Sequence, residues 1–274
     1  MNYGEFLNLK NFETHLRGKE LSENTVQVYV HAAEIFKEYL GNSSITEKIV
    51  SEYEKIIKSR YQTATVNLYL TALNQYLVFG GLREYCVKIR ALQRRKRAEN
   101  VLDKQEYQKL LYYLANRGDW KYYAILKTLA GTGIRISELK YITTDTLHAG
   151  MAQVYNKGKT REIYIGASLK KELECFCQSN HICEGAVFRG KGQTPITRGA
   201  INQKLIKIAE GAGVEKRKVH PHAFRHLFAK EYMNRYCNIA ELSCLLGHES
   251  VETTMIYLAN SSREYRERLD GLDL

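Results

Sequence analysis

The sequence has few of the features that interrupt helices or mark a membrane protein. It contains 2 prolines in 274 residues, so long helices are permitted almost throughout. No apolar run approaches the ~20 residues that a membrane span needs, and no basic stretch followed by an apolar core stands at the N-terminus. These absences argue against a membrane protein and predict a cytoplasmic one.

Motifs for metals and nucleotide cofactors are also missing. We find neither a Gly-x-x-x-x-Gly-Lys-Ser/Thr loop nor a cluster of carboxylates suited to Mg²⁺. The six cysteines are irregularly spaced, which in a chain without a leader favours reduced thiols. Cys175-x-Cys177 with Cys183 lacks the gap of about two to four residues that is typical of zinc ligands. The sequence therefore predicts no metal and no cofactor.

What the sequence has in excess is positive charge. Its net charge is +11 and its pI is about 9.2. Residues 1–100 contain 15 Lys and Arg against 11 Asp and Glu, and residues 101–274 contain 26 against 19. No long block of one sign occurs, so we expect the charge to be spread over a folded surface. A polyanionic partner follows, with nucleic acid as the main candidate.

Apolar residues recur at helical spacing through the first hundred residues. The pattern predicts helices over 3–16, 23–40, 46–57 and 65–79, the second of them capped by Ser22 and ended by Gly41. We predict a helical bundle over residues 1–95, a basic linker over 96–102 and a second domain over 103–274. The run Arg94, Arg95, Lys96 and Arg97 marks the boundary. Such a run is usually a solvated linker, and it can also lie along DNA phosphates.

The second part of the chain mixes helical patterns with one hairpin. Helices are predicted over 103–113, 121–129, 135–141, 168–178 and 197–211 and from Pro221 onward, with a hairpin of strands 152–155 and 162–165 and a short buried strand at Val187 and Phe188. The residues between the hairpin strands form a basic tip. The predicted fold class is mainly α with a small antiparallel β-sheet, an α+β arrangement.

Four polar residues near the C-terminal end form a candidate site. His222 and Arg225 make a His-x-x-Arg word, His248 follows in Leu-Gly-His, and Tyr257 stands nine residues later. As chemistry, this set offers a phenol nucleophile, a base, and a cation to hold an anion. Each residue also has an ordinary structural interpretation: Tyr257 as a core aromatic, His222 as a helix-surface residue, Arg225 as a solvated charge and His248 as a residue that favours a helix C-terminus. Single residues do not decide between the two.

The combination of sequence motifs does decide between the two interpretations. Gly133-Ile-Arg-Ile-Ser-Glu-Leu139, His222-x-x-Arg-His226 and Leu246-Gly-His-x-x-x-x-Thr-Thr-x-x-Tyr257 resemble the tyrosine recombinase (phage integrase) family, in particular Xer-like recombinases and mobile-element integrases. The pattern Ser22-x-x-Thr-x-x-x-Tyr29 with Phe36-x-x-Tyr-Leu40 is similar to the core-binding domain that precedes the catalytic domain in that family. The first hundred residues carry the weaker part of the resemblance.

The resemblance assigns a role to each matching residue. It implies a catalytic set made of Arg135, Lys157, His222, Arg225, His248 and Tyr257. Glu138 matches a position that supports the arginines, although an ordinary local ion pair with Arg135 is an equal alternative. For DNA binding we expect contributions from Arg94, Arg95, Lys96, Arg97, Lys159 and Arg161.

The implied activity is site-specific recombination. Tyr257 is expected to cleave and rejoin double-stranded DNA through a 3′-phosphotyrosyl intermediate, without metal or ATP, in a homotetramer on paired DNA sites. Two alternatives remain: a catalytically silent helical DNA-binding regulator or accessory protein, and a topoisomerase IB-like cleaver. The sequence leaves open the DNA target, and whether the task is integration, excision, inversion or chromosome dimer resolution.

Overall fold

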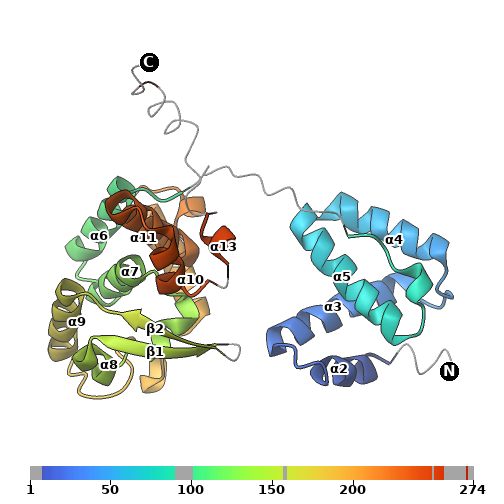
Figure 1. Ribbon diagram of the computed structural model, residues 1–274, viewed down its shortest axis with the longest axis horizontal. Coiled ribbons are helices and arrows are strands. Elements are labelled where there is room, and N and C mark those ends of the chain that lie inside the picture. The colour runs from blue at the N-terminus through green and yellow to red at the C-terminus, as the bar shows by residue number, and fades with distance from the viewer. Residues whose placement is uncertain (1–7, 90–100, 157–158, 249, 256–269, 271–274) are drawn as a thin grey trace. The chain divides into compact units, whose positions relative to one another are not determined.

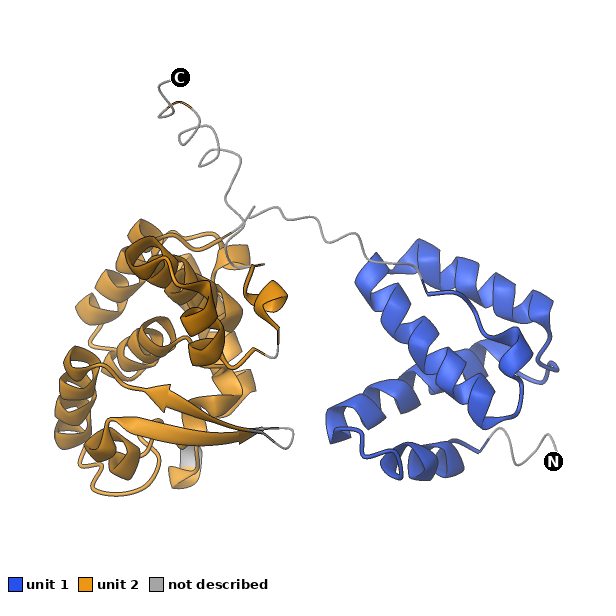
Figure 2. Cartoon of the chain, viewed as in Figure 1, with its two compact units in different colours: residues 1–95 blue, residues 96–274 orange. Residues whose placement is uncertain are grey.

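The computed structural model describes residues 8–89, 101–156, 159–248, 250–255 and 270, in two units (Figure 1). Contacts divide the chain into Met1–Arg95 and Lys96–Leu274, as Figure 2 shows. Each unit has a hydrophobic core of its own. The predicted fold class, mainly helical with a small antiparallel sheet, is confirmed.

The first unit is built from helices. They are α2 (Leu9–Arg17), α3 (Glu23–Leu40), α4 (Glu47–Arg60), α5 (Thr63–Phe79) and the short 3₁₀ helix η1 (Arg83–Tyr85). Ser22 caps α3, because its side chain accepts a hydrogen bond from the N–H of Thr25 at 3.3 Å, and Gly41 ends the helix at φ +57°. Both predicted ends of this helix are confirmed.

Aromatic side chains fill the core of the first unit. The rings of Phe12 and Tyr76 meet edge to face at a centroid distance of 5.0 Å, and those of Phe36 and Tyr53 at 4.9 Å. All four are almost completely buried. Because such rings bury large apolar areas, these pairs tie α2 to α5 and α3 to α4.

The second unit packs helices around one hairpin. Its elements are α6 (Lys104–Asn116), α7 (Trp120–Thr132), η2 (Ile136–Tyr141), α8 (Thr144–Ala149), β1 (Met151–Asn156), β2 (Lys159–Tyr164), α9 (Ala167–Ser179), η3 (Lys191–Gln193), α10 (Arg198–Gly211), η4 (Lys216–Lys218), α11 (Pro221–Tyr236), α12 (Ile239–Leu246) and α13 (Val251–Met255). Strands β1 and β2 pair antiparallel, with Met151 opposite Tyr164 and Val154 opposite Arg161. The hairpin projects beside α8 and α9 (Figure 1).

Two local predictions for the second unit need correction: the helix predicted over 135–141 is present but of the 3₁₀ type, and the predicted strand at Val187 and Phe188 is absent. The segment after Gly133 forms a 3₁₀ helix that begins after Arg135, whose N–H donates to the side chain of Glu138 at 2.7 Å. Val187 and Phe188 are buried but form no strand. Each finds a single partner, since Val187 N–H donates to the Ile142 carbonyl and the Phe188 carbonyl accepts from Ile196 N–H.

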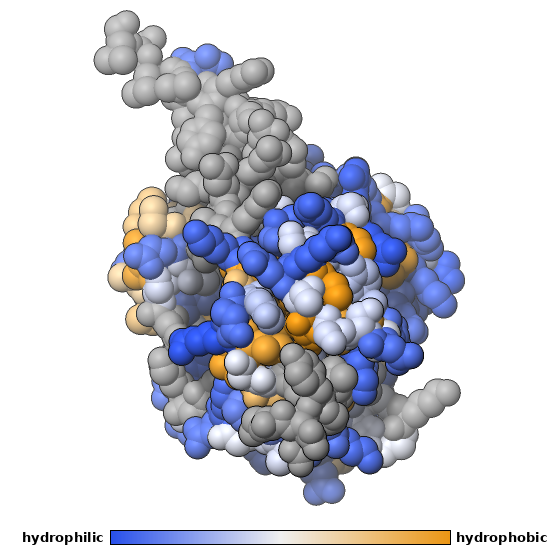
Figure 3. Space-filling view, turned by 90° about the vertical axis from the view of Figure 1, so that its right-hand side faces the viewer, coloured by the Kyte–Doolittle hydropathy of each residue, from blue (hydrophilic) through white to orange (hydrophobic). Residues whose placement is uncertain are grey.

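One face of the chain is seen in a space-filling view. Figure 3 shows a face on which hydrophilic residues dominate, with apolar side chains between them. Within the described ranges, no helix combines the length and the apolarity needed to cross a bilayer.

Candidate active site

Two helices of the second unit, α7 and α12, each end in a glycine, and their C-terminal ends lie close together in space. Gly133 follows α7 at φ +63° and Gly247 follows α12 at φ +62°, a left-handed conformation that glycine adopts without strain. A Cβ on Gly133 would lie 2.5 Å from a ring carbon of Phe228 and 2.9 Å from a methyl carbon of Leu246. The ends of α7 and α12 therefore pack closely, and their last carbonyls carry partial negative charge.

Arg225 binds both helix ends. It lies on α11, is 1 % exposed, and donates from Nη1 to the Gly133 carbonyl at 2.7 Å and from Nη2 to the Leu246 carbonyl at 2.6 Å. Partial charges at helix C-termini favour a cation in this position. The guanidinium is thus held rigidly beneath the surface.

Two further arginines bind the carbonyls on either side of Leu246. Arg161, on β2, donates from Nη1 to the Leu245 carbonyl at 2.7 Å. Arg135 donates from Nη2 to the Gly247 carbonyl at 3.5 Å, a long contact. Three consecutive carbonyls at the end of α12 thus accept hydrogen bonds from three arginines that come from different parts of the chain.

Glu138 joins two of these arginines. Its carboxylate is 2 % exposed; Oε1 accepts from Nη1 of Arg135 at 3.2 Å, and Oε2 accepts from Nη2 of Arg161. Burial alone would raise the pKa of this carboxyl, but the hydrogen bonds and charges of Arg135 and Arg161 outweigh it and lower the pKa. Glu138 therefore stays ionised. The local ion pair with Arg135 is present, and a second, with Arg161, was not anticipated.

His248 makes a hydrogen bond through each ring nitrogen. Nε2 lies 2.8 Å from Nη2 of Arg225, and Nδ1 lies 2.7 Å from Oγ1 of Thr254. Because a guanidinium only donates, Nε2 accepts and the ring proton sits on Nδ1, where it is donated to Thr254. Burial, together with the charges of Arg225, Arg135 and Arg161, lowers the pKa of His248 to about 4. The imidazole is therefore neutral near pH 7.

Thr254 is a site residue that sequence reasoning did not single out. It is fully buried on α13, three residues before Tyr257. The doubled threonine of the Leu-Gly-His motif was its only signal. Its hydrogen bond to His248 ties α13 to the residue that follows Gly247.

His222 occupies the first turn of α11, between His220 and Arg225. Its side chain is exposed. Partial desolvation lowers its pKa, and the charges of Arg225, Arg135 and Arg198 lower it further because they oppose a second positive charge. A neutral, accessible imidazole beside two arginines can accept a proton.

The described part of the chain brings together four of the six predicted catalytic residues, together with Glu138. Hydrogen bonds join Arg135 to Glu138 and Arg225 to His248, and both arginines also donate to carbonyls at the end of α12. His222 is within electrostatic reach of the two arginines. The remaining predicted residues, which are Lys157, Tyr257, Arg94, Arg95, Lys96, Arg97 and the side chain of Lys159, lie outside the described residues. No cluster of three or more possible metal ligands occurs among the side chains that the structure describes.

Arg161, which we predicted to bind DNA, lies largely inside the protein. We expected it to contact DNA, but its side chain is 14 % exposed and donates to Leu245 and Glu138. The reason lies in the alternation of β2, where Arg161 shares a face with Ile163, which is 2 % exposed. That face points into the protein.

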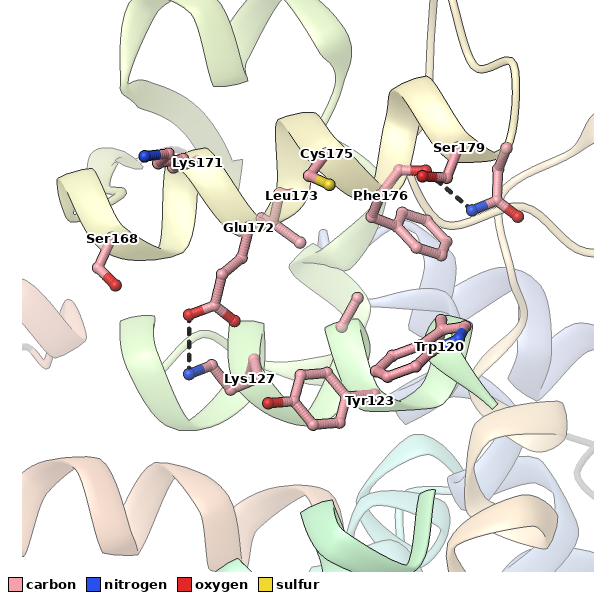
Figure 4. A pocket seen from close by; sticks show the side chains of 12 residues that line it. Trp120, Tyr123, Lys127, Ser168, Lys171, Glu172, Leu173, Cys175, Phe176 and Ser179 are labelled. Carbon is pink, nitrogen blue, oxygen red and sulfur yellow. Dashed lines mark hydrogen bonds and ion pairs between the residues drawn. The ribbon is translucent and has the colours of Figure 1, made fainter. Parts of the chain in front are cut away.

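A hollow of about 700 Å³ between α7 and α9 lies apart from this cluster. Figure 4 shows Trp120 and Phe176 on its walls and the ion pair of Lys127 with Glu172, whose N–O distance is 3.0 Å. It is mainly apolar and contains none of the arginines or histidines described above.

The sequence of the chain was compared with protein families and with known proteins. The model of the phage integrase family matches residues 100–264. The chain is 27 % identical to tyrosine recombinase XerA of Pyrococcus furiosus, over 97 % of this chain and 94 % of that protein. It is 34 % identical to tyrosine recombinase XerC of Lactobacillus delbrueckii over 53 % of each.

Solved structures share the fold. A crystal structure of XerA recombinase aligns with a TM-score of 0.56 and 23 % identity, covering 100 % of this chain and 99 % of that one. A lambda integrase tetramer bound to a Holliday junction aligns with a TM-score of 0.74 and 17 % identity, covering 91 % and 75 %. With the family match over residues 100–264, which include the arginine cluster, the chain belongs to the phage integrase family.

Proposed function

We propose that this chain is a site-specific DNA recombinase that cleaves and rejoins duplex DNA through a 3′-phosphotyrosyl bond at Tyr257. The observation that carries the proposal is the cluster of Arg135, Arg225 and His248, held together by the C-terminal ends of α7 and α12. The tyrosine recombinases among its relatives support it.

The charge of the cluster suits a phosphodiester under attack. Arg135, Arg161 and Arg225 carry three positive charges and Glu138 one negative charge, which leaves two positive charges. A phosphodiester carries one negative charge and gains a second as an oxygen adds to phosphorus. Cations fixed in advance where charge develops are usually the largest catalytic contribution. Fixation here comes from backbone carbonyls and Glu138, so the guanidinium groups themselves need little reorganisation.

Proton transfer is assigned to two residues. A tyrosine has a pKa of about 10, so the hydroxyl of Tyr257 needs a base, and we assign that role to His222, whose lowered pKa supports a neutral ring. The bond from phosphorus to the 5′-oxygen breaks as the bond to the tyrosine oxygen forms. Lys157 donates the proton that the leaving 5′-oxygen requires. One phosphoester replaces another, so religation needs no input of energy.

In this proposal Arg225 acts from beneath the protein surface on which the reacting phosphate binds. Because it is 1 % exposed, a direct contact with a phosphate requires a neighbouring side chain such as His248 to shift. Until then its charge adds to the local potential and its hydrogen bond orients the His248 ring. Arg135, whose side chain is 32 % exposed, is the more accessible of the pair.

We assign DNA binding to the first unit and to the basic run Arg94–Arg97. We also propose that four copies of the chain assemble on two DNA sites. The positive excess in residues 1–100 supports the first assignment, and the lambda integrase tetramer supports the second. A chain limited to residues 96–274 should bind DNA more weakly than the full chain at about 0.15 M salt, with a shallower salt dependence, because it makes fewer phosphate contacts. Equal affinity and slope would contradict the assignment.

A suicide substrate tests the proposed chemistry. The full chain is incubated with nicked duplexes from the DNA that flanks its gene, so that the 5′-hydroxyl product diffuses away and the covalent adduct accumulates. Tyr257→Phe should form no adduct and should bind the same DNA with nearly unchanged affinity, since phosphate contacts dominate binding. A chain that binds DNA without an adduct is a regulator. One that relaxes supercoiled plasmid without exchanging strands between paired sites is topoisomerase-like.

A further inference from the structure

Arg161 connects three elements that are distant in sequence. From β2 its Nη1 donates to the Leu245 carbonyl at the end of α12, and its Nη2 donates to Glu138 on η2. Glu138 in turn binds the side chain and the backbone N–H of Arg135. The hairpin, the turn after α12 and the accessible arginine are therefore joined through one guanidinium.

The turn after α12 lies directly on the stem of this side chain. A Cβ built on Gly247 would lie 2.2 Å from Cδ and 3.0 Å from Nε of Arg161. No side chain fits there while Arg161 keeps its position. The glycine of the Leu-Gly-His word therefore meets two demands, a left-handed backbone and the close approach of Arg161.

We propose that Arg161 is a positioning residue that locks the orientation of Arg135, through Glu138, to the turn at Leu245–Gly247. The inference rests on the proposed function, because its consequence is the rate of DNA cleavage. It replaces the role in DNA binding that the sequence pattern predicted for Arg161.

An arginine is required for this geometry. Its planar fork presents two nitrogens that donate at a fixed angle, one to the Leu245 carbonyl and one to the Glu138 carboxylate. A lysine has a single nitrogen on a flexible stem and keeps the charge without bridging the two acceptors in the same way. With neither an arginine nor a lysine at position 161, Glu138 is a buried carboxylate with Arg135 as its remaining cationic partner.

The first test measures cleavage with DNA at saturation. Arg161→Met should slow formation of the covalent adduct by about a hundredfold, the size of effect expected when a reacting group is displaced by about 1 Å. Affinity for DNA should stay within about twofold, because a buried guanidinium makes no phosphate contact. Arg117→Met, at an exposed arginine of the same unit, is the matched control and should cleave like the parent. Weaker binding with an unchanged rate at saturation would show that Arg161 contacts DNA and would overturn the inference.

A pH profile separates positioning from a general loss of structure. Among the described residues, the charged groups that face Glu138 are Arg135, which immediately precedes η2, and Arg161 from β2, and both hold its pKa down. Removing Arg161 raises that pKa, so cleavage by Arg161→Met should fall further as the pH is lowered toward 5, relative to the parent. In the double variant Arg161→Met with Glu138→Gln this added acid sensitivity should vanish. Persistence of the sensitivity without Glu138 would contradict the proposed route.

Arg161→Lys covers the case in which Arg161→Met does not fold. It keeps the charge and most of the stem, and we expect folding with an intermediate cleavage rate and parental DNA affinity. If Arg161→Lys cleaves DNA at the parental rate, the inference about Arg161 is overturned and the proposed function still stands. A parent chain that forms no adduct overturns the proposed function, and this inference with it.

Discussion

Nη2 of Arg225 donates to Nε2 of His248 at 2.8 Å, so the imidazole is a neutral ring with its proton on Nδ1. The same nitrogen also donates to the Leu246 carbonyl at 2.6 Å. One buried cation therefore fixes both the end of α12 and the histidine that follows it. A change at either residue should be felt by the other.

Arg225→Met is expected to destabilise the protein. The carbonyls of Gly133 and Leu246 lose their guanidinium donor, and each buried group left without a partner costs about 1–3 kcal/mol. Urea unfolding measures the loss. Arg117→Met, whose side chain is exposed, should change the free energy of unfolding by no more than about 0.5 kcal/mol. Equal stability of the two variants would contradict the anchoring role of Arg225.

His248 should make stability depend on pH on the acid side. Its pKa is about 4 in the folded chain against 6.5 for the free group, so the unfolded state binds more protons between these values. The free energy of unfolding should therefore fall as the pH drops from about 6.5 to about 4, and His248→Gln should reduce that slope. Chemical unfolding at several pH values measures it. His222 shifts in the same direction, so the slope should become smaller without disappearing.

Gly247→Ala should cost more than Gly150→Ala. Both glycines end a helix with positive φ, +62° and +72°, so both variants carry the strain of a left-handed alanine, about 1–2 kcal/mol. Only at Gly247 does the new Cβ meet another side chain, Arg161, whereas nothing lies within 4 Å at Gly150. Thermal unfolding of the two variants gives the difference. Equal losses would mean that Arg161 gives way without cost.

Lys157→Ala should be rescued by a better leaving group. An alkoxide, whose conjugate acid has a pKa near the value of about 15.7 for water, needs a proton as it leaves, and a thiolate of pKa about 8.5 does not. DNA with sulfur at the bridging 5′ position should restore adduct formation to Lys157→Ala and leave Arg135→Ala and Arg225→Ala slow. Rescue of Lys159→Ala in place of Lys157→Ala would move the assignment to Lys159.

Sequence alone determined the features that depend on local chemistry. Ser22 and Gly41 bound α3 because a hydroxyl cap and a left-handed glycine act within one turn of the chain. Asp103 begins α6 for the same reason, in a reciprocal capping box with Glu106. The motif words also identified Arg135, Arg225 and His248 as members of one site, since their order and spacing are specific to a family.

Tertiary structure decided what those residues contact. The bonds of Arg161 to Leu245, Arg225 to Gly133 and Arg135 to Gly247 span 84, 92 and 112 residues, and no local pattern specifies them. The sequence spacing of the basic residues in and near the hairpin tip did not reveal that the side chain of Arg161 faces inward. Arg161 does so because β2 places it on the side of Ile163, next to a glycine turn and a buried carboxylate. The proton on Nδ1 of His248 likewise follows only from its partners, because the hydrogen bonds made by the two ring nitrogens determine which of them carries the proton.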